Sequence, residues 1–151
     1  MAFRGFNKGR EYRDPEEALK LKRWIDRSNQ QRTDIVEVID EHFVELFKDV
    51  QLVQEAVSNT ETLGWALDRL SILALKIFHM EIEVNRTNSA IVHRELCRRK
   101  NDILLCQKQD LISAINQLLI DTANGKKRIN IYKQMKMYND PNLNPVLYNK
   151  V

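Results

Sequence analysis

Residues 63–84, LGWALDRLSILALKIFHMEIEV, carry apolar side chains around most of the circumference of a helix. One column follows heptad spacing through Leu63, Leu67, Leu70, Ala74 and Ile77, and continues on the adjoining column at Met80 and Val84. Further apolar side chains widen this surface at Trp65, Ile72, Leu73 and Phe78. A helix that is apolar over so much of its surface lies at the centre of a bundle or contacts a second subunit. The segment therefore predicts an all-α protein.

The segment before it, residues 33–57, has the most regular apolar pattern in the chain. Steps of four and three residues connect Ile39, Phe43, Leu46, Val50, Val53 and Val57. This spacing is typical of one helix packed along its length against another, as in a coiled coil. A shorter helix is expected over residues 15–28, with Asp14 as its N-cap and Pro15 at its first position.

The second half of the chain predicts further helices. Apolar residues resume at Ile91 and continue to a strong stop signal, Gly125 after Asn124. A last short helix is expected over about residues 127–138. The pattern weakens at residues 85–90, so residues 60–124 form either one long helix or two.

The sequence thus predicts a bundle of four to five helices over residues 14–138, with extended N- and C-terminal arms at residues 1–13 and 139–151. Few glycines and prolines favour long helices over a β-sandwich or barrel. Both arms carry apolar anchors, which disordered tails usually lack: Phe3, Phe6, Leu147 and Tyr148.

Charge is distributed unevenly along the chain, although the formal net charge is only +3. Residues 33–62 hold one base against eight acids, whereas residues 1–32 and 94–151 are basic. Contacts between the acidic middle and the basic ends are therefore favoured. The sequence shows no membrane span and no secretion signal, so we expect a cytoplasmic protein or a component of a virion-like assembly.

A metal site is the first chemical possibility to test, at the pairs His79/Glu83 and His93/Cys97. Each pair is four residues apart and would lie on one face of a helix. On a continuous helix, however, the four side chains would span about 27 Å. Only a sharp turn at residues 85–89 could bring the two pairs together, so we expect no metal site.

Catalysis is also not expected. Cys97 is the best candidate nucleophile, because nearby arginines could activate it. The chain nevertheless has no glycine-rich oxyanion loop and no nucleotide-binding motif. We therefore expect no catalytic residues, no cofactor and no small-molecule substrate.

The basic runs could instead contact phosphate groups without reading sequence. One run lies near the start of the helix predicted after residue 90 and consists of Arg94, Arg98 and Arg99. The other follows Gly125 and consists of Lys126, Lys127 and Arg128. In the alternative interpretation these bases pair with the acidic segment.

The leading hypothesis is a non-enzymatic structural or assembly subunit, similar in design to virion components, connectors or scaffolds. It would form a homo-oligomer or a larger protein assembly through apolar helix faces and anchored arms. The residues expected to mediate self-association are Trp65, Ile72, Phe78, Phe3, Phe6, Leu147 and Tyr148. The alternative is a nucleic-acid-associated helical protein that binds through the two basic runs.

Overall fold

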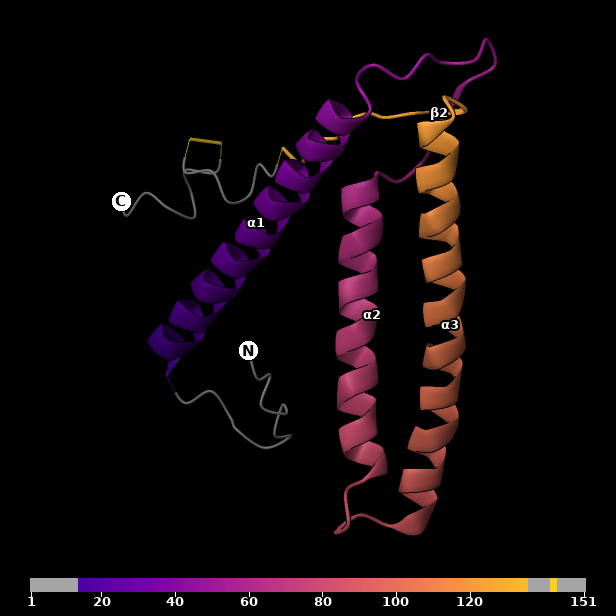
Figure 1. Cartoon of the computed structure of the whole chain (residues 1–151). Helices are drawn as coiled ribbons and strands as arrows, with labels where there is room; N and C mark the ends of the chain where they lie inside the picture. The colour runs from indigo at the N-terminus through magenta and orange to yellow at the C-terminus, as the bar shows by residue number, and fades with distance from the viewer. Residues whose placement is uncertain (1–13, 136–141, 144–151) are drawn as a thin grey trace. The chain divides into compact units, whose positions relative to one another are not determined.

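The computed structural model describes residues 14–135 and 142–143, which form three helices and two very short strands (Figure 1). In chain order these are α1 (Pro15–Leu46), β1 (Val57–Ser58), α2 (Leu63–Val84), α3 (Ile91–Ala123) and β2 (Lys127–Arg128). The prediction of an all-α protein is confirmed, and the prediction of four to five helices is wrong. None of the described helices is long and apolar enough to cross a membrane.

The first helix begins where the sequence predicts, because Asp14 Oδ1 accepts a hydrogen bond from the backbone N–H of Glu16 at 2.9 Å. It then runs without interruption through residues 28–32, where a break between two helices was expected. These residues are polar but include no proline or glycine that would stop a helix. One bond beside them is typical of a continuing helix: Thr33 Oγ1 donates to the Asn29 carbonyl four residues earlier, at 3.0 Å.

The end of α1 corrects the prediction of a helix over residues 33–57. The helix stops at Leu46, and the chain continues as a loop to Val57. In this loop the backbone N–H of Val53 donates to the Gly125 carbonyl at 3.1 Å, and that of Val57 donates to the Lys126 carbonyl at 3.2 Å. Hydrogen bonds with a distant segment therefore replace those of a helix.

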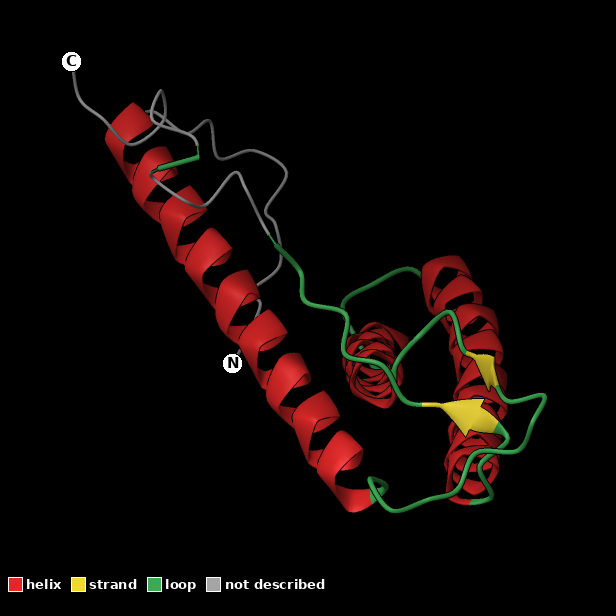
Figure 2. Ribbon diagram, turned by 90° about the horizontal axis from the view of Figure 1, so that it is seen from above, coloured by secondary structure: helices red, strands yellow, loops and turns green. Residues whose placement is uncertain are grey.

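The short helix predicted over residues 127–138 is also absent from the described residues. Instead, β2 pairs in parallel with β1, with Val57 opposite Lys127 and Ser58 opposite Arg128. Figure 2 shows these two strands as the yellow arrows. Residues 129–135 are neither helix nor strand, and residues 136–138 lie outside the described residues.

The chain divides into two compact units, one of residues Ile35–Lys133 and one of Met1–Asp34 with Gln134–Val151. In the first unit, α2 and α3 lie side by side as an antiparallel hairpin (Figures 1 and 2). The loop of residues 85–90 separates them, so residues 60–124 contain two helices and not one. Apart from the terminal arms, the candidate sites and surfaces described below lie in the unit of residues 35–133.

The interface within the hairpin follows heptad spacing, with a register that differs from the predicted one. On α2 the buried apolar residues are Leu63, Ala66, Leu73 and Ile77. Ala66 and Leu73 thus take the places that the sequence pattern gave to Leu67 and Ala74, and Ala74 is exposed. On α3 the buried residues are Cys97, Ile115 and Thr122.

The start of α2 is tied to α1 by a buried carboxylate. Asp40, which is 3% exposed, accepts hydrogen bonds from the Thr62 hydroxyl at 2.5 Å and from the backbone N–H of Gly64 at 2.7 Å. Thr62 is the N-cap of α2, and its hydroxyl oxygen accepts from the N–H of Trp65. A Cβ at position 64 would lie 2.6 Å from the carbonyl oxygen of Val36, so only glycine allows this close approach.

The end of α3 confirms the predicted stop at Gly125. This residue has φ of 70°, which favours glycine. Its N–H donates to the Thr122 carbonyl, and the N–H of Lys126 donates to the Asp121 carbonyl. This pair of bonds is the Schellman motif, which ends α3 and sends the chain toward β1.

Candidate interaction surface

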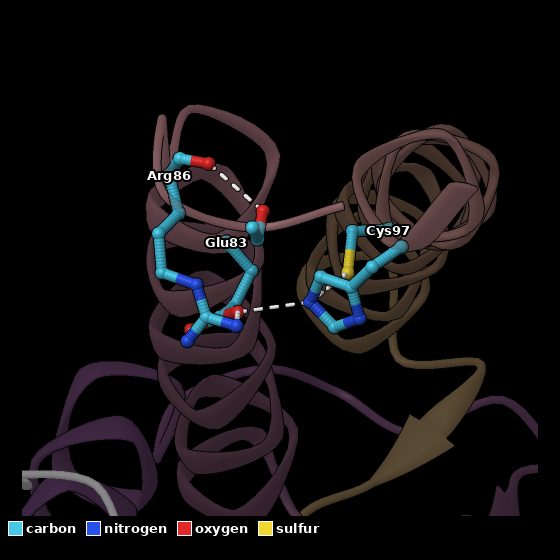
Figure 3. A network of polar contacts seen from close by, with 5 residues as sticks. Glu83, Arg86 and Cys97 are labelled. Carbon is cyan, nitrogen blue, oxygen red and sulfur yellow. Dashed lines mark hydrogen bonds and ion pairs between the residues drawn. The ribbon is translucent and has the colours of Figure 1, made fainter. Parts of the chain in front are cut away.

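The turn between α2 and α3 brings together side chains from the two pairs that the sequence marked as metal candidates. His93 Nε2 lies 3.0 Å from Glu83 Oε2, and Cys97 Sγ lies 3.5 Å from the same nitrogen. Figure 3 shows Glu83 on α2 reaching toward α3, where Cys97 lies, with Arg86 beside Glu83. The Arg86 guanidinium is 3.2 Å from the Glu83 carboxylate. The sharp turn therefore exists, and it joins Glu83, His93 and Cys97 in one polar cluster.

The cluster does not form a preassembled metal centre. Among the residues that the structure describes, no three His, Cys, Asp or Glu side chains are grouped so as to hold a metal ion. His79 stands apart: its ring contacts Phe78 at 5.4 Å between centroids, and within the described chain its buried Nε2 has no hydrogen-bond partner.

The geometry of the cluster also differs from that of a catalytic Cys–His–acid triad. In a triad, one imidazole nitrogen faces the nucleophile and the other faces the acid. Here both contacts of the His93 ring involve Nε2, so this ring orientation cannot pass a proton between Cys97 and Glu83. Cys97 is also only 6% exposed, which restricts access to its thiol.

A small hollow lies near the start of α2, lined by parts of α1, α2, α3 and the segment after β2. Its interior of about 20 Å³ has room for about one water molecule. Thr122, whose buried hydroxyl has no partner among the described residues, forms part of its wall. The hollow fits a structural water and is too small for an organic substrate.

The two basic runs lie at opposite ends of α3. Arg94, Arg98 and Arg99 are in its first turns, whereas the run of residues 126–128 follows its last residue. The rise along the helix separates them by roughly 40 Å, so they do not share one surface.

In each basic run one side chain has a partner within the described residues. In the first run, Arg98 is paired with Glu95 at 2.8 Å, and the buried Nε of Arg94 has no partner among the described residues. In the second run, Arg128 Nε donates to the Ala56 carbonyl at 3.0 Å. Lys126 and Lys127 adjoin this bond at the paired strands.

The residues expected to mediate self-association differ in exposure. Phe78 is 56% exposed, whereas Trp65 and Ile72 are half-buried. The arm residues Phe3, Phe6, Leu147 and Tyr148 lie outside the described residues.

Phe78 belongs to an apolar stripe that faces away from the interface with α3. Leu75, Phe78 and Ile82 follow steps of three and four residues and are each about half exposed; we call them the outer stripe of α2. At about 100° per residue, the stripe lies roughly 140° around the helix from the mean direction of the buried apolar residues, which are Leu63, Ala66, Leu73 and Ile77.

A second stripe lies on the outside of α3 and was not distinguished by the sequence analysis. Val92, Leu96 and Ile103, here called the outer stripe of α3, are between 48% and 81% exposed. The inward positions at the same level include the half-buried polar residues Arg94 and Asn101 beside the buried Cys97 and the half-buried Leu104. By polarity alone the column of Arg94, Asn101 and Lys108 would be expected to face solvent, so the sequence pattern did not indicate which side of α3 faces α2.

The chain matches one family model, described as "Protein of unknown function (DUF4254)", over residues 10–131. No curated protein and no solved structure matches the chain. The matched range includes all three helices and both strands, with the polar cluster and the two outer stripes. The chain therefore belongs to the DUF4254 family of proteins of unknown function.

Proposed function

We propose that this protein is a non-enzymatic structural or assembly subunit that self-associates through its exposed apolar helix faces. The observation that supports this most is the outward apolar surface of the α2–α3 hairpin near its turn. The six large apolar side chains of the two outer stripes are between 44% and 81% exposed, while the polar side chains of Arg94 and Asn101 on α3 are half-buried. Exposed apolar patches of this kind mark interaction sites.

The free energy of burying apolar side chains favours a partner that covers the outer stripes. Burying a large apolar side chain completely is worth about 1.5–3 kcal/mol, so covering six half-exposed side chains would contribute roughly 5–10 kcal/mol per copy. Association costs about 4–15 kcal/mol in lost translational and rotational freedom. The two outer stripes of two copies can therefore supply enough free energy to hold them together.

The terminal arms belong to the same proposal. Their anchors Phe3, Phe6, Leu147 and Tyr148 would dock on a neighbouring copy and lock the assembly. Virion components, connectors and scaffold proteins are analogies of design for such a subunit.

The mass of the full-length protein in solution tests this proposal. Light scattering should give at least twice the chain mass of 17.8 kDa. Phe78→Ser and Leu96→Ser should each lower that mass, because each removes an anchor from one outer stripe. Leu52→Ser is the matched control, since Leu52 is as exposed as Leu96 but lies in the loop after α1 and should leave the mass unchanged.

A monomer at all accessible concentrations would contradict the proposal. If such a monomer also bound DNA or RNA with an affinity that falls steeply with salt, the basic runs would become the functional residues instead. Equal loss of mass in the control and in the stripe variants would show that the outer stripes are not the contact.

A further inference from the structure

We propose that the α2–α3 hairpin binds the phosphoryl group of a small phosphorylated molecule between Lys76 of α2 and Lys100 of α3. The site lies on the side of the hairpin where Glu83 contacts His93. It is separate from the outer stripes and does not require self-association.

The contact between Glu83 and His93 fixes which residues of the two helices lie opposite each other. His93 Nε2 is 3.0 Å from Glu83 Oε2, so these two residues form one level of the antiparallel hairpin. Seven residues back along α2 and seven forward along α3, the same two columns meet again, because the helices pack with heptad spacing. That level holds Lys76 and Lys100. Figure 1 shows α2 and α3 side by side over this length.

These two lysines lack a compensating acid. The residues three and four positions away in the sequence are Ile72, Leu73, His79 and Met80 for Lys76, and Leu96, Cys97, Ile103 and Leu104 for Lys100. None of them is acidic, so neither lysine can form an ion pair with the next turn of its own helix. Both lysines are exposed, and neither takes part in an ion pair among the described residues.

An anion between the two lysines would remove their mutual repulsion. Helices packed side by side have axes about 8–10 Å apart, so two flexible four-carbon stems at one level can bring both ammonium groups to a single ligand group. A phosphoryl group suits this position better than a carboxylate, because it carries more negative charge and offers three strong acceptor oxygens. The apolar residues beside the lysines strengthen the attraction, since they lower the local dielectric constant.

Further donors lie on either side of the lysine level. Arg69 and Gln107 occupy the next level, about 10 Å farther from the turn. The Arg69 side chain is 64% exposed. On the other side, His79 lies one turn from Lys76, and its buried Nε2 has no hydrogen-bond partner within the described chain. A ligand at the lysine level therefore has an imidazole toward the turn and a guanidinium and an amide away from it.

Carboxylates at both ends favour a small ligand over a nucleic acid. Glu83 lies one level beyond Lys76 toward the turn, and Glu61 pairs with Arg69 at 2.8 Å toward the start of α2. A nucleic-acid strand carries a phosphate at every nucleotide and would bring further phosphates against these acids. A small molecule needs only the cations between them.

Isothermal titration calorimetry of the full chain with inorganic pyrophosphate tests this site. The unmodified protein should bind one pyrophosphate per chain. Lys76→Gln and Lys100→Gln should each weaken binding about tenfold or more, because each variant loses a hydrogen bond between charged groups. Arg98→Gln is the matched control and should bind as tightly as the unmodified protein. Arg98 is an exposed cation of α3 two residues from Lys100, and therefore on the opposite side of the helix.

Thermal unfolding gives a readout that a damaged fold would not reproduce. Without ligand, Lys76→Gln should melt at or above the temperature of the unmodified protein, because it removes the repulsion between the two lysines. Pyrophosphate should raise the melting temperature of the unmodified protein and of Arg98→Gln, and should raise that of Lys76→Gln less. A ligand-free Lys76→Gln protein that melts at a lower temperature would overturn the argument from like charges.

Three further results would overturn the assignment of this site. One is the absence of pyrophosphate binding. Another is an equal loss of affinity in Arg98→Gln and in the two lysine variants, which would show attraction to net charge alone. The third is lysine-dependent binding of single-stranded DNA or of phosphatidylserine vesicles that is tighter than binding of pyrophosphate. In that case the lysines would contact the phosphates of a nucleic acid or a lipid surface, and not those of a small molecule.

Discussion

Replacement of Asp40 by alanine should destabilise the protein strongly. The Asp40 carboxylate is 3% exposed and accepts two hydrogen bonds, from the Thr62 hydroxyl and from the Gly64 N–H. A hydrogen bond to a charged group contributes about 1.5–3 kcal/mol, and a buried donor left without a partner costs about 1–3 kcal/mol. Since removal of the carboxylate also relieves its desolvation cost, we expect a net loss of about 2–4 kcal/mol.

Urea unfolding followed by far-ultraviolet circular dichroism measures this loss. The midpoint should fall while the dependence of the unfolding free energy on urea stays unchanged, because the folded and unfolded surfaces are the same. Asp34→Ala is the control: Asp34 is on the same helix and exposed, and its bond to Gln30 at 2.8 Å is local. Surface changes of this kind stay within about 0.5 kcal/mol. An Asp40→Ala loss no larger than the control's would refute the argument that this carboxylate holds α2 to α1.

Two further changes probe the packing around α2. Gly64→Ala should lower the unfolding free energy by about 1–3 kcal/mol, because the new Cβ would lie 2.6 Å from the Val36 carbonyl oxygen; a neutral result in the same urea experiment would show that the helices can separate without cost. Asn101→Leu should raise it by about 0.5–1.5 kcal/mol, because the buried Oδ1 of Asn101 has no partner among the described residues. A loss of stability in this variant would mean that the amide has a partner that the described residues do not provide.

Signals that act locally allowed much of the fold to be predicted. Asp14 and Pro15 fix the start of α1, and Gly125 fixes the end of α3, because each residue satisfies or frees backbone groups within a few positions. The break at residues 85–90 was visible as a weak pattern, and it was undecided because no single residue there forces a turn. The structure places two helices on either side of it.

The errors arose where distant contacts override local patterns. Val50, Val53 and Val57 continue the heptad spacing of α1, yet the backbones of Val53 and Val57 bond to the segment after α3. Only the folded arrangement of the α2–α3 hairpin brings that segment near, so helical periodicity could not reveal it. A break between two helices was also predicted at the polar residues 28–32. That prediction was wrong because polarity alone does not end a helix.

The candidate surface was predicted only in part, and for a comparable reason. Phe78 was identified by its place on a helix that is apolar nearly all round, but such a helix does not show which of its columns faces α3. Asp40 was not singled out, although its spacing from Val36 and Phe43 puts it on the buried side of α1. An acid within an apolar column was the signal for the buried bond to Gly64.

The arrangement of polar and apolar residues in the hairpin affects the stability of the single chain. Arg94, Asn101 and Lys108 are half-buried at heptad spacing on the side of α3 that faces α2, and polar residues at such positions fix register at a cost in stability. The same seam holds the buried Cys97 and Ile115, while Val92, Leu96 and Ile103 of α3 stay exposed. The single hairpin therefore buries less apolar surface than a fully apolar seam would, and a partner that covered the exposed side chains would add to its stability. If the protein self-associates as proposed, the same feature that weakens the single chain would favour the assembled state.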